Sequence, residues 1–336
     1  MPSQRAVMLL LLMSPSVLTG TELGVKDTQF TLNGQPVFLL GISYYGGLDA
    51  SDETVHRDLV RLRESGFNWI RVWATWHSGE NNASAVDAEG KAREPYMARL
   101  KALVAKYDRA GLVVDVTLAP QQASPDGRKP GYLATFDAHR RAVQTITATL
   151  RPHRNWYLDL ANERNIRDPR YVSFDDLVKL RAAARQADPA LLVTASQGGD
   201  IDERELREYL LKVKVDFICP HRPRDAASPA STEETTRRYL ARMRALGRVV
   251  PVNYQEPFRR GYADWQPRAE DFLADAQGAR RGGAAAWCLH NGSQRQGGEP
   301  FRSFDLRKKA LFEQLDEQER RAIEWLKAQV SSTRPR

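Results

Sequence analysis

The chain has few cysteines and histidines, and none of them is spaced as a metal-binding motif. Only two cysteines occur in 336 residues, which excludes a disulfide-rich scaffold and any zinc site built from four cysteine ligands. The six histidines include no H-E-x-x-H motif or comparable spacing, so the sequence does not indicate a zinc hydrolase. We therefore expect no metal site.

Two further motifs of common enzyme classes are missing. No G-x-S-x-G sequence is present to form the nucleophile elbow of a serine hydrolase. The glycines of GISYYGG (41–47) are out of register with G-x-G-x-x-G, which argues against a dinucleotide-binding fold. Disorder is also excluded, because 42% of the residues are hydrophobic and can form a large core.

Long apolar runs are absent apart from one short run at the N-terminus. Residues 6–13 (AVMLLLLM) are all apolar, but a bilayer span needs roughly 20 such residues. Arg5 precedes this run, and small and turn-forming residues follow it, which predicts a secretory signal peptide over 1–20. The alternative is a frayed, mildly apolar terminus. We expect a secreted or periplasmic protein with no membrane span.

After this segment, short apolar stretches alternate with segments of helical spacing. Strands are predicted at 37–43, 67–73, 112–118, 156–160, 191–196, 215–219, 249–253 and 283–289. Helices are predicted at 52–65, 95–110, 137–150, 173–187, 201–211, 232–246, 267–281 and 316–329. Short apolar strands separated by helices indicate a parallel sheet, and eight such units fit a closed barrel better than an open sheet. The predicted fold is α/β: a single-domain (β/α)8 TIM barrel that spans 21–336.

Two glutamates follow predicted strands four and seven. Glu163 comes three residues after the first of these strands, and Glu256 three residues after the second. A barrel of this kind carries its chemistry at the carboxyl ends of its strands, so both side chains should reach the same mouth. Retaining glycoside cleavage needs two carboxyl groups about 5–5.5 Å apart. Otherwise the two residues are ordinary surface acids.

Four short motifs support the first of these interpretations. They are NWIRVW with Arg71, the pair Asn162-Glu163, the strand-seven Glu256, and AAAWCLH with Trp287. In this order and on these strands they resemble the clan A glycoside hydrolases, nearest to the cellulase and mannanase relatives of glycoside hydrolase family 5. The resemblance covers residues 30–291. It departs from the family pattern at Arg164, where relatives usually have proline.

The resemblance implies a retaining glycosidase that hydrolyses O-glycosyl bonds in a β-linked poly- or oligosaccharide. Glu163 would be the general acid/base and Glu256 the nucleophile, while Asn162 would bind the sugar 2-hydroxyl. Arg71 would lie beneath Glu256 and keep it ionised, and the charge on Glu256 would raise the pKa of Glu163. No cofactor is expected, because two carboxyl groups supply the acid, the base and the nucleophile.

Further residues around the strand ends are candidates for substrate binding. His221 and Tyr254 would lie near the two glutamates, and Trp287 would form the platform on which a sugar ring stacks. Each could instead be a core residue with satisfied hydrogen bonds. The same choice applies to the aromatic residues in the strand-end loops, which are Tyr44, Tyr45, Trp73, Trp76 and Trp265.

Arginine is abundant in the loops after strands four, six, seven and eight. These loops contain Arg164, Arg167, Arg222, Arg224, Arg259, Arg260 and Arg295. Guanidinium groups bind carboxylates and sulfates bidentately, so the arginines suggest an anionic glycan; the alternative is that they pair with nearby acids. The formal net charge of +8 permits anionic partners without identifying one.

The sequence thus predicts a monomer whose partner is a saccharide, with no nucleic-acid partner. Two alternatives remain open at this point. A transglycosylase would use the same residues and differ only in the acceptor. A non-catalytic carbohydrate-binding barrel would keep the cleft without turnover.

Overall fold

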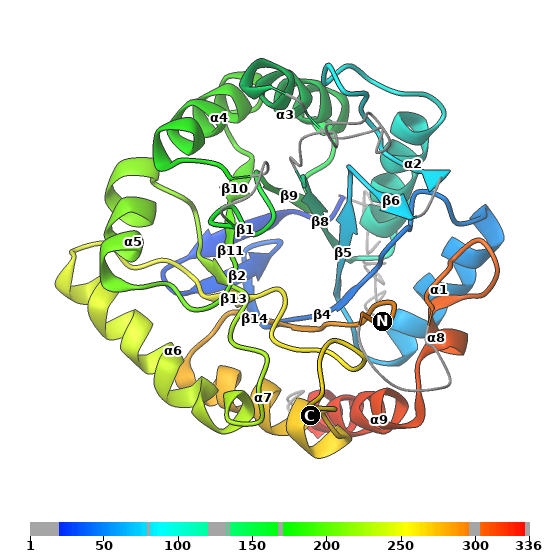
Figure 1. Ribbon diagram of the computed structural model, residues 1–336, viewed down its shortest axis with the longest axis vertical. Helices are drawn as coiled ribbons and strands as arrows, with labels where there is room; N and C mark the ends of the chain where they lie inside the picture. Colours follow the sequence, from blue (N-terminus) through cyan, green and yellow to red (C-terminus); the bar gives the residue numbers. More distant parts are fainter. Residues whose placement is uncertain are drawn as a thin grey trace, which may run out of the picture.

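The computed structural model describes residues 20–78, 81–119, 133, 135–166, 171–295 and 303–332. Eight parallel strands form a central ring, and the helices surround it (Figure 1). The predicted signal peptide lies outside the described residues except for Gly20, and so does Arg167. No helix in the described part of the chain is both long and apolar enough to cross a membrane.

The ring consists of the eight strands that the sequence predicts. In chain order they are β4 (Leu39–Ser43), β5 (Trp69–Trp73), β8 (Val113–Thr117), β9 (Trp156–Asp159), β10 (Leu192–Thr194), β12 (Cys219–Pro220), β13 (Asn253–Tyr254) and β14 (Ala286–Leu289). Seven of them form one sheet in the order β10-β9-β8-β5-β4-β14-β13. The short strand β11 (Ser196–Gln197), directly after β10, pairs with β12, and a bridge between Ile218 and Val252 joins β12 to β13. These pairings close the barrel.

Helices cover the outside of the ring, and all of them except the short α8 overlap predicted helices. They are α1 (Asp52–Glu64), α2 (Tyr96–Arg109), α3 (Phe136–Leu150), α4 (Phe174–Ala187), α5 (Glu203–Arg207) with the π-helical η1 (Glu208–Val213), α6 (Ser228–Ala245), α7 (Ala269–Gly282), α8 (Leu311–Gln314) and α9 (Glu317–Ser332). The side chains of Ser51, Thr135, Ser173 and Asp202 accept a backbone hydrogen bond at the starts of α1, α3, α4 and α5. Helix α6 begins four residues earlier than predicted, with Pro229 in its first turn, where no backbone donor is needed.

A small antiparallel sheet, not predicted from the sequence, covers the amino-terminal end of the barrel. It comprises β1 (Leu23–Lys26), β2 (Gln29–Leu32) and β3 (Gln35–Val37), and it is visible through the ring in Figure 1. Asn33 and Gly34 join β2 to β3 with positive φ angles of 51° and 78°, as a tight hairpin turn requires. Phe30 is fully buried, and its ring lies 5.0 Å from that of Phe217 inside the barrel.

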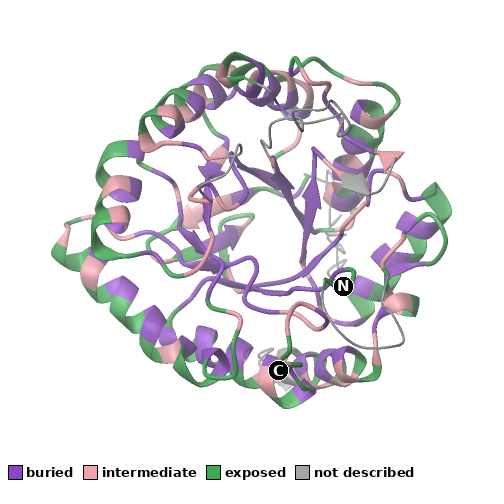
Figure 2. Ribbon diagram, in the orientation of Figure 1, coloured by how far each residue is buried: buried purple, intermediate pink, exposed green. Residues whose placement is uncertain are grey.

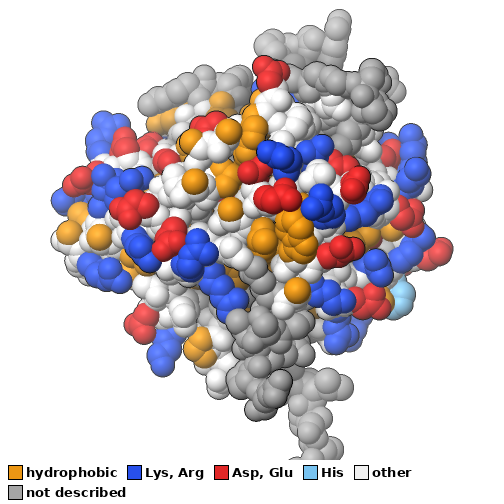
Figure 3. Space-filling model, turned by 90° about the horizontal axis from the view of Figure 1, so that it is seen from below, with side chains coloured by type: hydrophobic (Ala, Val, Ile, Leu, Met, Phe, Trp, Pro, Cys, Tyr) orange, Lys and Arg blue, Asp and Glu red, His pale blue; other side chains and the backbone are white. Residues whose placement is uncertain are grey.

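The core has two layers, because side chains alternate along each strand. Trp69, Tyr157 and Cys288 pack inside the barrel, whereas residues such as Ile70 and Leu158 pack against the helices. Figure 2 shows the result: the strands of the ring are almost entirely buried, and each helix is buried mainly on its inner face. At the surface, side chains of both charges are interspersed over the face seen in Figure 3.

Inside the barrel, space is limited to the point that one strand position requires glycine. A Cβ atom at Gly41 on β4 would lie 1.8 Å from the ring of Trp69. The indole therefore fills the lower barrel, and polar side chains occupy the levels above it, towards the carboxyl ends of the strands. A second hairpin, β6 (His77–Ser78) with β7 (Asn81–Asn82), follows β5 at that mouth.

Candidate active site

A cavity of about 390 Å³ opens at the carboxyl ends of the strands and contains both predicted glutamates. Glu163 follows β9 and Glu256 follows β13, as expected. One carboxylate oxygen of Glu163 and one of Glu256 lie within 4.8 Å of each other. The two carboxyl groups thus approach each other closely, as the predicted spacing of about 5–5.5 Å requires.

Arg71 lies beneath Glu256, where the sequence placed it. Its side chain comes from β5, is fully buried and forms an ion pair with the Glu256 carboxylate. The same guanidinium donates to Asn162 Oδ1 at 2.8 Å and forms ion pairs of 3.2 Å with Asp115 and Asp159. Arg71 thereby holds two of the residues that line the cavity, Asn162 and Glu256, from below.

Glu256 is surrounded by groups that stabilise its charged form. Its side chain is only 6% exposed, and this burial on its own would raise the pKa of the carboxyl group. The interactions of the carboxylate with His221, His290, Arg71 and Arg224 outweigh burial and hold the pKa of Glu256 well below its usual value. Glu256 is therefore ionised at neutral pH, as a carboxylate nucleophile must be.

Glu163 departs from the expectation based on its neighbour's charge. Burial and the charge of Glu256 do raise its pKa, but the hydrogen bond from His221 and the charges of His221 and Arg224 lower it more. His221 Nδ1 and Arg224 Nη2 each lie 3.2 Å from Glu163 Oε1. The net result is a pKa below the usual value, which corrects the predicted increase.

The backbone also aims Glu163 into the cavity. Its φ angle of +46° lies in the left-handed region, which costs a residue other than glycine about 1–3 kcal/mol. The backbone N–H of Glu163 donates to Ser196 Oγ at 3.0 Å, which helps to hold this conformation. Strain of this kind is often found where a side chain must be held for binding or catalysis.

Two histidines complete the surroundings of the glutamates. His221, predicted from the sequence, is buried between them, with Nδ1 3.2 Å from Glu163 and 3.7 Å from Glu256. His290, which the sequence analysis did not select, follows β14 and places Nε2 3.4 Å from Glu256 while Nδ1 lies 3.0 Å from Ser43 Oγ. Burial lowers the pKa of His290 well below its usual value.

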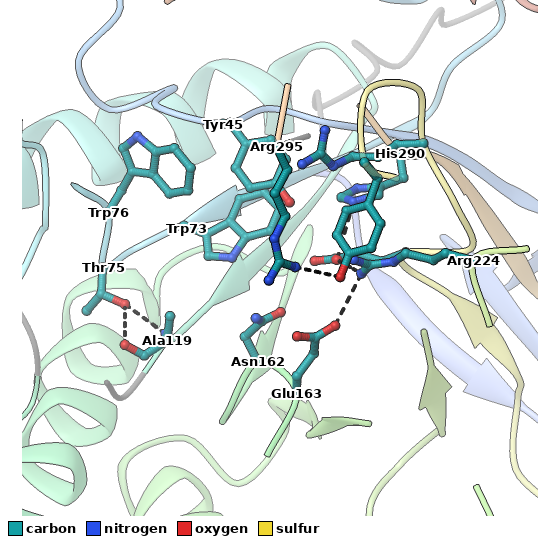
Figure 4. A pocket seen from close by; sticks show the side chains of 13 residues that line it. Tyr45, Trp73, Thr75, Trp76, Ala119, Asn162, Glu163, Arg224, His290 and Arg295 are labelled. Atoms are coloured by element: carbon teal, nitrogen blue, oxygen red, sulfur yellow. Dashed lines mark hydrogen bonds and ion pairs between the residues drawn. The ribbon is translucent and has the colours of Figure 1, made fainter. Parts of the chain in front are cut away.

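Glu163, His221 and Glu256 place potential metal ligands within 4.8 Å of one another. However, Arg224 Nη2 lies 2.7 Å from Glu256 Oε2 and 3.2 Å from Glu163 Oε1, so a protein cation bridges the two carboxylates (Figure 4). We therefore assign no metal to this cluster.

Aromatic residues form one wall of the cavity. Tyr45 stacks on Trp73 with ring centroids 4.0 Å apart, and Trp76 lies 4.8 Å from Tyr45 (Figure 4). Flat apolar surfaces of this kind suit the C–H faces of sugar rings. Of the other aromatic candidates, Tyr44 is buried and donates to Asp58, and Trp265 packs edge-on against Phe258.

The structure places two predicted binding residues away from the cavity. Trp287 on β14 points outward and donates from Nε1 to Asp275 on α7 at 2.6 Å. The hydroxyl group of Tyr254 on β13 lies 2.7 Å from that of Thr236 on α6. Both corrections have the same reason: successive strand residues face opposite sides, so neighbours of inward-facing residues point towards the helices.

Three of the seven loop arginines line the cavity, namely Arg224, Arg259 and Arg295. Three others have partners elsewhere: Arg164 with Glu205, Arg222 with Asp200 and Arg260 with Asp316. These three arginines therefore pair with acids, as does Arg224 through Glu163 and Glu256, whereas Arg224, Arg259 and Arg295 lie at the cavity.

No protein-family model and none of the curated proteins matches this sequence. Solved structures do share its fold. An endo-1,4-beta-mannanase from Rhizomucor miehei matches with a TM-score of 0.63 at 11% identity, over 93% of this chain and 100% of the mannanase. A glycoside hydrolase family 5 protein from Bacteroides vulgatus matches with a TM-score of 0.63 at 14% identity, over 92% and 71% of the two chains.

A provisionally assigned glycoside hydrolase from the same bacterium gives a TM-score of 0.65 at 14% identity. This match covers 94% of the present chain but only 61% of the longer one. At these identities the matches establish the fold, and they confirm the predicted (β/α)8 barrel and its likeness to the family 5 glycoside hydrolases.

Proposed function

We propose that the protein is a retaining glycosidase that hydrolyses a β-linked poly- or oligosaccharide. The observation that carries the proposal is the pair Glu163 and Glu256 at the barrel mouth, with oxygens within 4.8 Å, one of them held ionised by Arg71. The aromatic wall beside them and the fold shared with family 5 glycoside hydrolases support it. The predicted export of the chain suits an extracellular glycan.

In the proposed first step, the Glu256 carboxylate attacks the anomeric carbon while the bond to the leaving oxygen breaks. Glu163 donates its proton to that oxygen, and a covalent glycosyl-enzyme forms. In the second step, Glu163 takes a proton from water, whose oxygen displaces Glu256 from the sugar. Asn162, held by Arg71, is positioned to bind a sugar hydroxyl next to the reacting carbon.

One feature favours a second candidate, a carbohydrate-binding barrel without turnover. Arg224 bridges the two carboxylates, and together with the hydrogen bond from His221 its charge favours the ionised form of Glu163 over the protonated form that the first step requires. If Arg224 never moves, the cavity binds saccharides and does not cleave them. Transfer of the glycosyl group to a second sugar would need the same two glutamates.

A substrate panel with matched variants tests the proposal. Aryl β-glycosides and β-linked polysaccharides, including mannan because several structural neighbours are mannanases, are incubated with the wild type, Glu163→Gln and Glu256→Gln. Glu64→Gln, an exposed residue on α1, controls for the loss of one carboxylate.

We expect turnover of at least one substrate by the wild type and Glu64→Gln. Glu256→Gln should lose about 10³-fold on every substrate that is turned over, and Glu163→Gln should lose about as much on substrates with poor leaving groups. Saccharide binding without turnover on the whole panel would instead establish the binding barrel. Glycosyl transfer in place of hydrolysis would appear as longer oligosaccharide products.

A further inference from the structure

The position of Arg224 is unusual for a site that must deliver a proton. It lies in the loop between β12 and α6, and its side chain is 14% exposed. Its Nη2 atom contacts Glu256 Oε2 and Glu163 Oε1, so the guanidinium occupies the gap between the two carboxylates. A glycosidic oxygen must enter this gap to receive a proton from Glu163. Arg224 must therefore move away from Glu163 before cleavage.

Two more arginines lie around the same aromatic ring as Arg224. The guanidinium carbon of Arg224 lies 4.3 Å from the ring centroid of Tyr262, and those of Arg259 and Arg295 lie 5.3 Å and 5.1 Å from it. Arg295 also donates to the Tyr262 hydroxyl at 2.7 Å. We call these three arginines with Tyr262 the arginine wall; it faces the same cavity as the two glutamates.

The charges of the cavity do not balance within the described lining residues. Three arginines and two glutamates line the cavity in the described part of the chain, and the buried Arg71 below them is paired with Glu256, Asp115 and Asp159. Arg259 donates to the backbone carbonyls of Arg260 and Ser293. Once Glu163 carries the proton that it must donate, the excess of positive charge grows by one.

We propose that the arginine wall binds an anionic group of the substrate, a uronate carboxylate or a sulfate ester close to the scissile bond, and that this group draws Arg224 away from Glu163. The inference rests on the proposed function and names its substrate class. Guanidinium forks match such oxyanions in geometry as well as in charge. A neutral sugar offers Arg224 no replacement for its two carboxylate contacts, so the wall selects acidic glycans.

The movement of Arg224 also links binding to catalysis. In the free protein His221, Arg224 and Glu256 face Glu163, and the contacts of the first two favour its ionised form. Transfer of Arg224 to the substrate anion removes one of them, and Glu163 then takes up a proton more readily. Binding of an acidic substrate thus favours the protonated form of Glu163 that cleavage requires.

The first test compares an acidic oligosaccharide with its neutral counterpart, in uronate and sulfate series. The variants are Arg295→Gln, Arg295→Lys and, as a matched control, Arg237→Gln, which removes an exposed arginine on α6. We expect the ratio of kcat/KM for acidic over neutral substrate to fall about 10–100-fold in Arg295→Gln. We expect a smaller fall in Arg295→Lys and none in Arg237→Gln.

The second test measures the movement of Arg224 through the pH dependence of Arg224→Gln. Loss of this cation raises the pKa of Glu163, so the alkaline limb of kcat/KM for neutral substrates should move to higher pH. The preference for acidic substrates should fall at the same time. A purely structural role for Arg224 would lower stability without moving this limb.

The outcomes separate this inference from the proposed function. One outcome is that kcat/KM on neutral sugars equals or exceeds that on acidic ones, and that the acidic-over-neutral ratio is unchanged in Arg295→Gln. That outcome would overturn anion binding by the arginine wall and leave the glycosidase proposal intact. A second outcome is that no substrate is turned over, but acidic oligosaccharides bind at least tenfold more tightly than neutral ones and Arg295→Gln loses this preference. That outcome would support the arginine wall and reject the hydrolase. Equal binding of acidic and neutral oligosaccharides would reject the wall.

Discussion

Glu163 is the residue on which the proposed chemistry depends most closely. It combines a left-handed backbone, contacts to His221 and Arg224, and a pKa below the usual value. An acid with these neighbours donates a proton well only at low pH or after one of them moves. Its contribution is therefore best measured with substrates that differ in how much they need a proton.

Glu163→Ala should separate substrates by their leaving groups. Activated aryl glycosides leave without protonation, so formation of the glycosyl-enzyme should persist, measured as the burst or as kcat/KM. Substrates with poor leaving groups should lose about 10²–10⁴-fold in kcat/KM, which is the usual size of general-acid catalysis. Equal losses for both kinds of substrate would count against the acid role.

The pH profile of the wild type should differ between the same substrates. Because the pKa of Glu163 is lowered, its protonated form disappears as the pH rises through a value below the usual one. For poor leaving groups, kcat/KM of a neutral substrate should accordingly fall from acidic pH upwards. Activated leaving groups should lack this limb, and a limb common to both would place the titrating group elsewhere.

At the scale of the strand, alternation decides which side chains reach the cavity. On β5, Trp69, Arg71 and Trp73 share the inner side, and the last two contact the site. On β14 and just beyond it, Cys288 and His290 lie inside the barrel and Trp287 lies outside. The sequence contains this alternation, but Trp287 was selected through the resemblance carried by AAAWCLH, and His290 was not considered.

Trp287→Phe tests the corrected placement. The variant removes the hydrogen bond to the buried Asp275 and some packing against α7, so the free energy of unfolding should fall by about 2–3 kcal/mol. KM should not change, because Trp287 does not line the cavity.

Trp73→Phe is the matched variant inside the cavity, and it should raise KM about 2–10-fold through weaker stacking on the sugar. Denaturant titrations and saturation curves of the two variants distinguish these expectations. A raised KM in Trp287→Phe would restore the platform that the sequence suggested.

Loops are where prediction from the sequence stops. Arg222 and Arg224 are two residues apart, yet Arg222 turns back to Asp200 and Arg224 reaches both glutamates. The left-handed φ of +51° at Arg222 precedes this divergence. Neither the backbone conformation of a loop nor the partner of a loop side chain follows a periodic sequence pattern. The sequence therefore identified the loop arginines as a group, without separating those that line the cavity from those that pair elsewhere.

At the scale of the whole molecule, the barrel was predictable because each of its eight units has its own local pattern. Strand β12 has only two residues in regular pairing, but the apolar stretch 215–219 was sufficient to predict it. The sheet β1–β3 was not predicted, because its strands have three or four residues and little periodicity. Its position under the barrel depends on contacts such as that between Phe30 and Phe217.

The closed barrel also explains why the sequence was sufficient to predict that two glutamates far apart in the chain lie close together. Parallel strands that close into a ring have all their carboxyl ends at one mouth, so a residue after strand four and one after strand seven meet there. The central claim is that Glu256, one of this pair, attacks the sugar. This claim concerns the bond between the Glu256 carboxylate and the anomeric carbon, and the formation of that bond can be tested directly.

The most direct measurement uses Glu256→Ala with an activated aryl β-glycoside and sodium azide. We expect the variant to lose turnover and azide to restore part of it, because the small anion enters the space vacated by the carboxylate and attacks the anomeric carbon from that side. Nuclear magnetic resonance of the product should show a glycosyl azide of inverted, α configuration. Full activity of Glu256→Ala without azide, or rescue that yields only the β-glycosyl azide, would contradict the account.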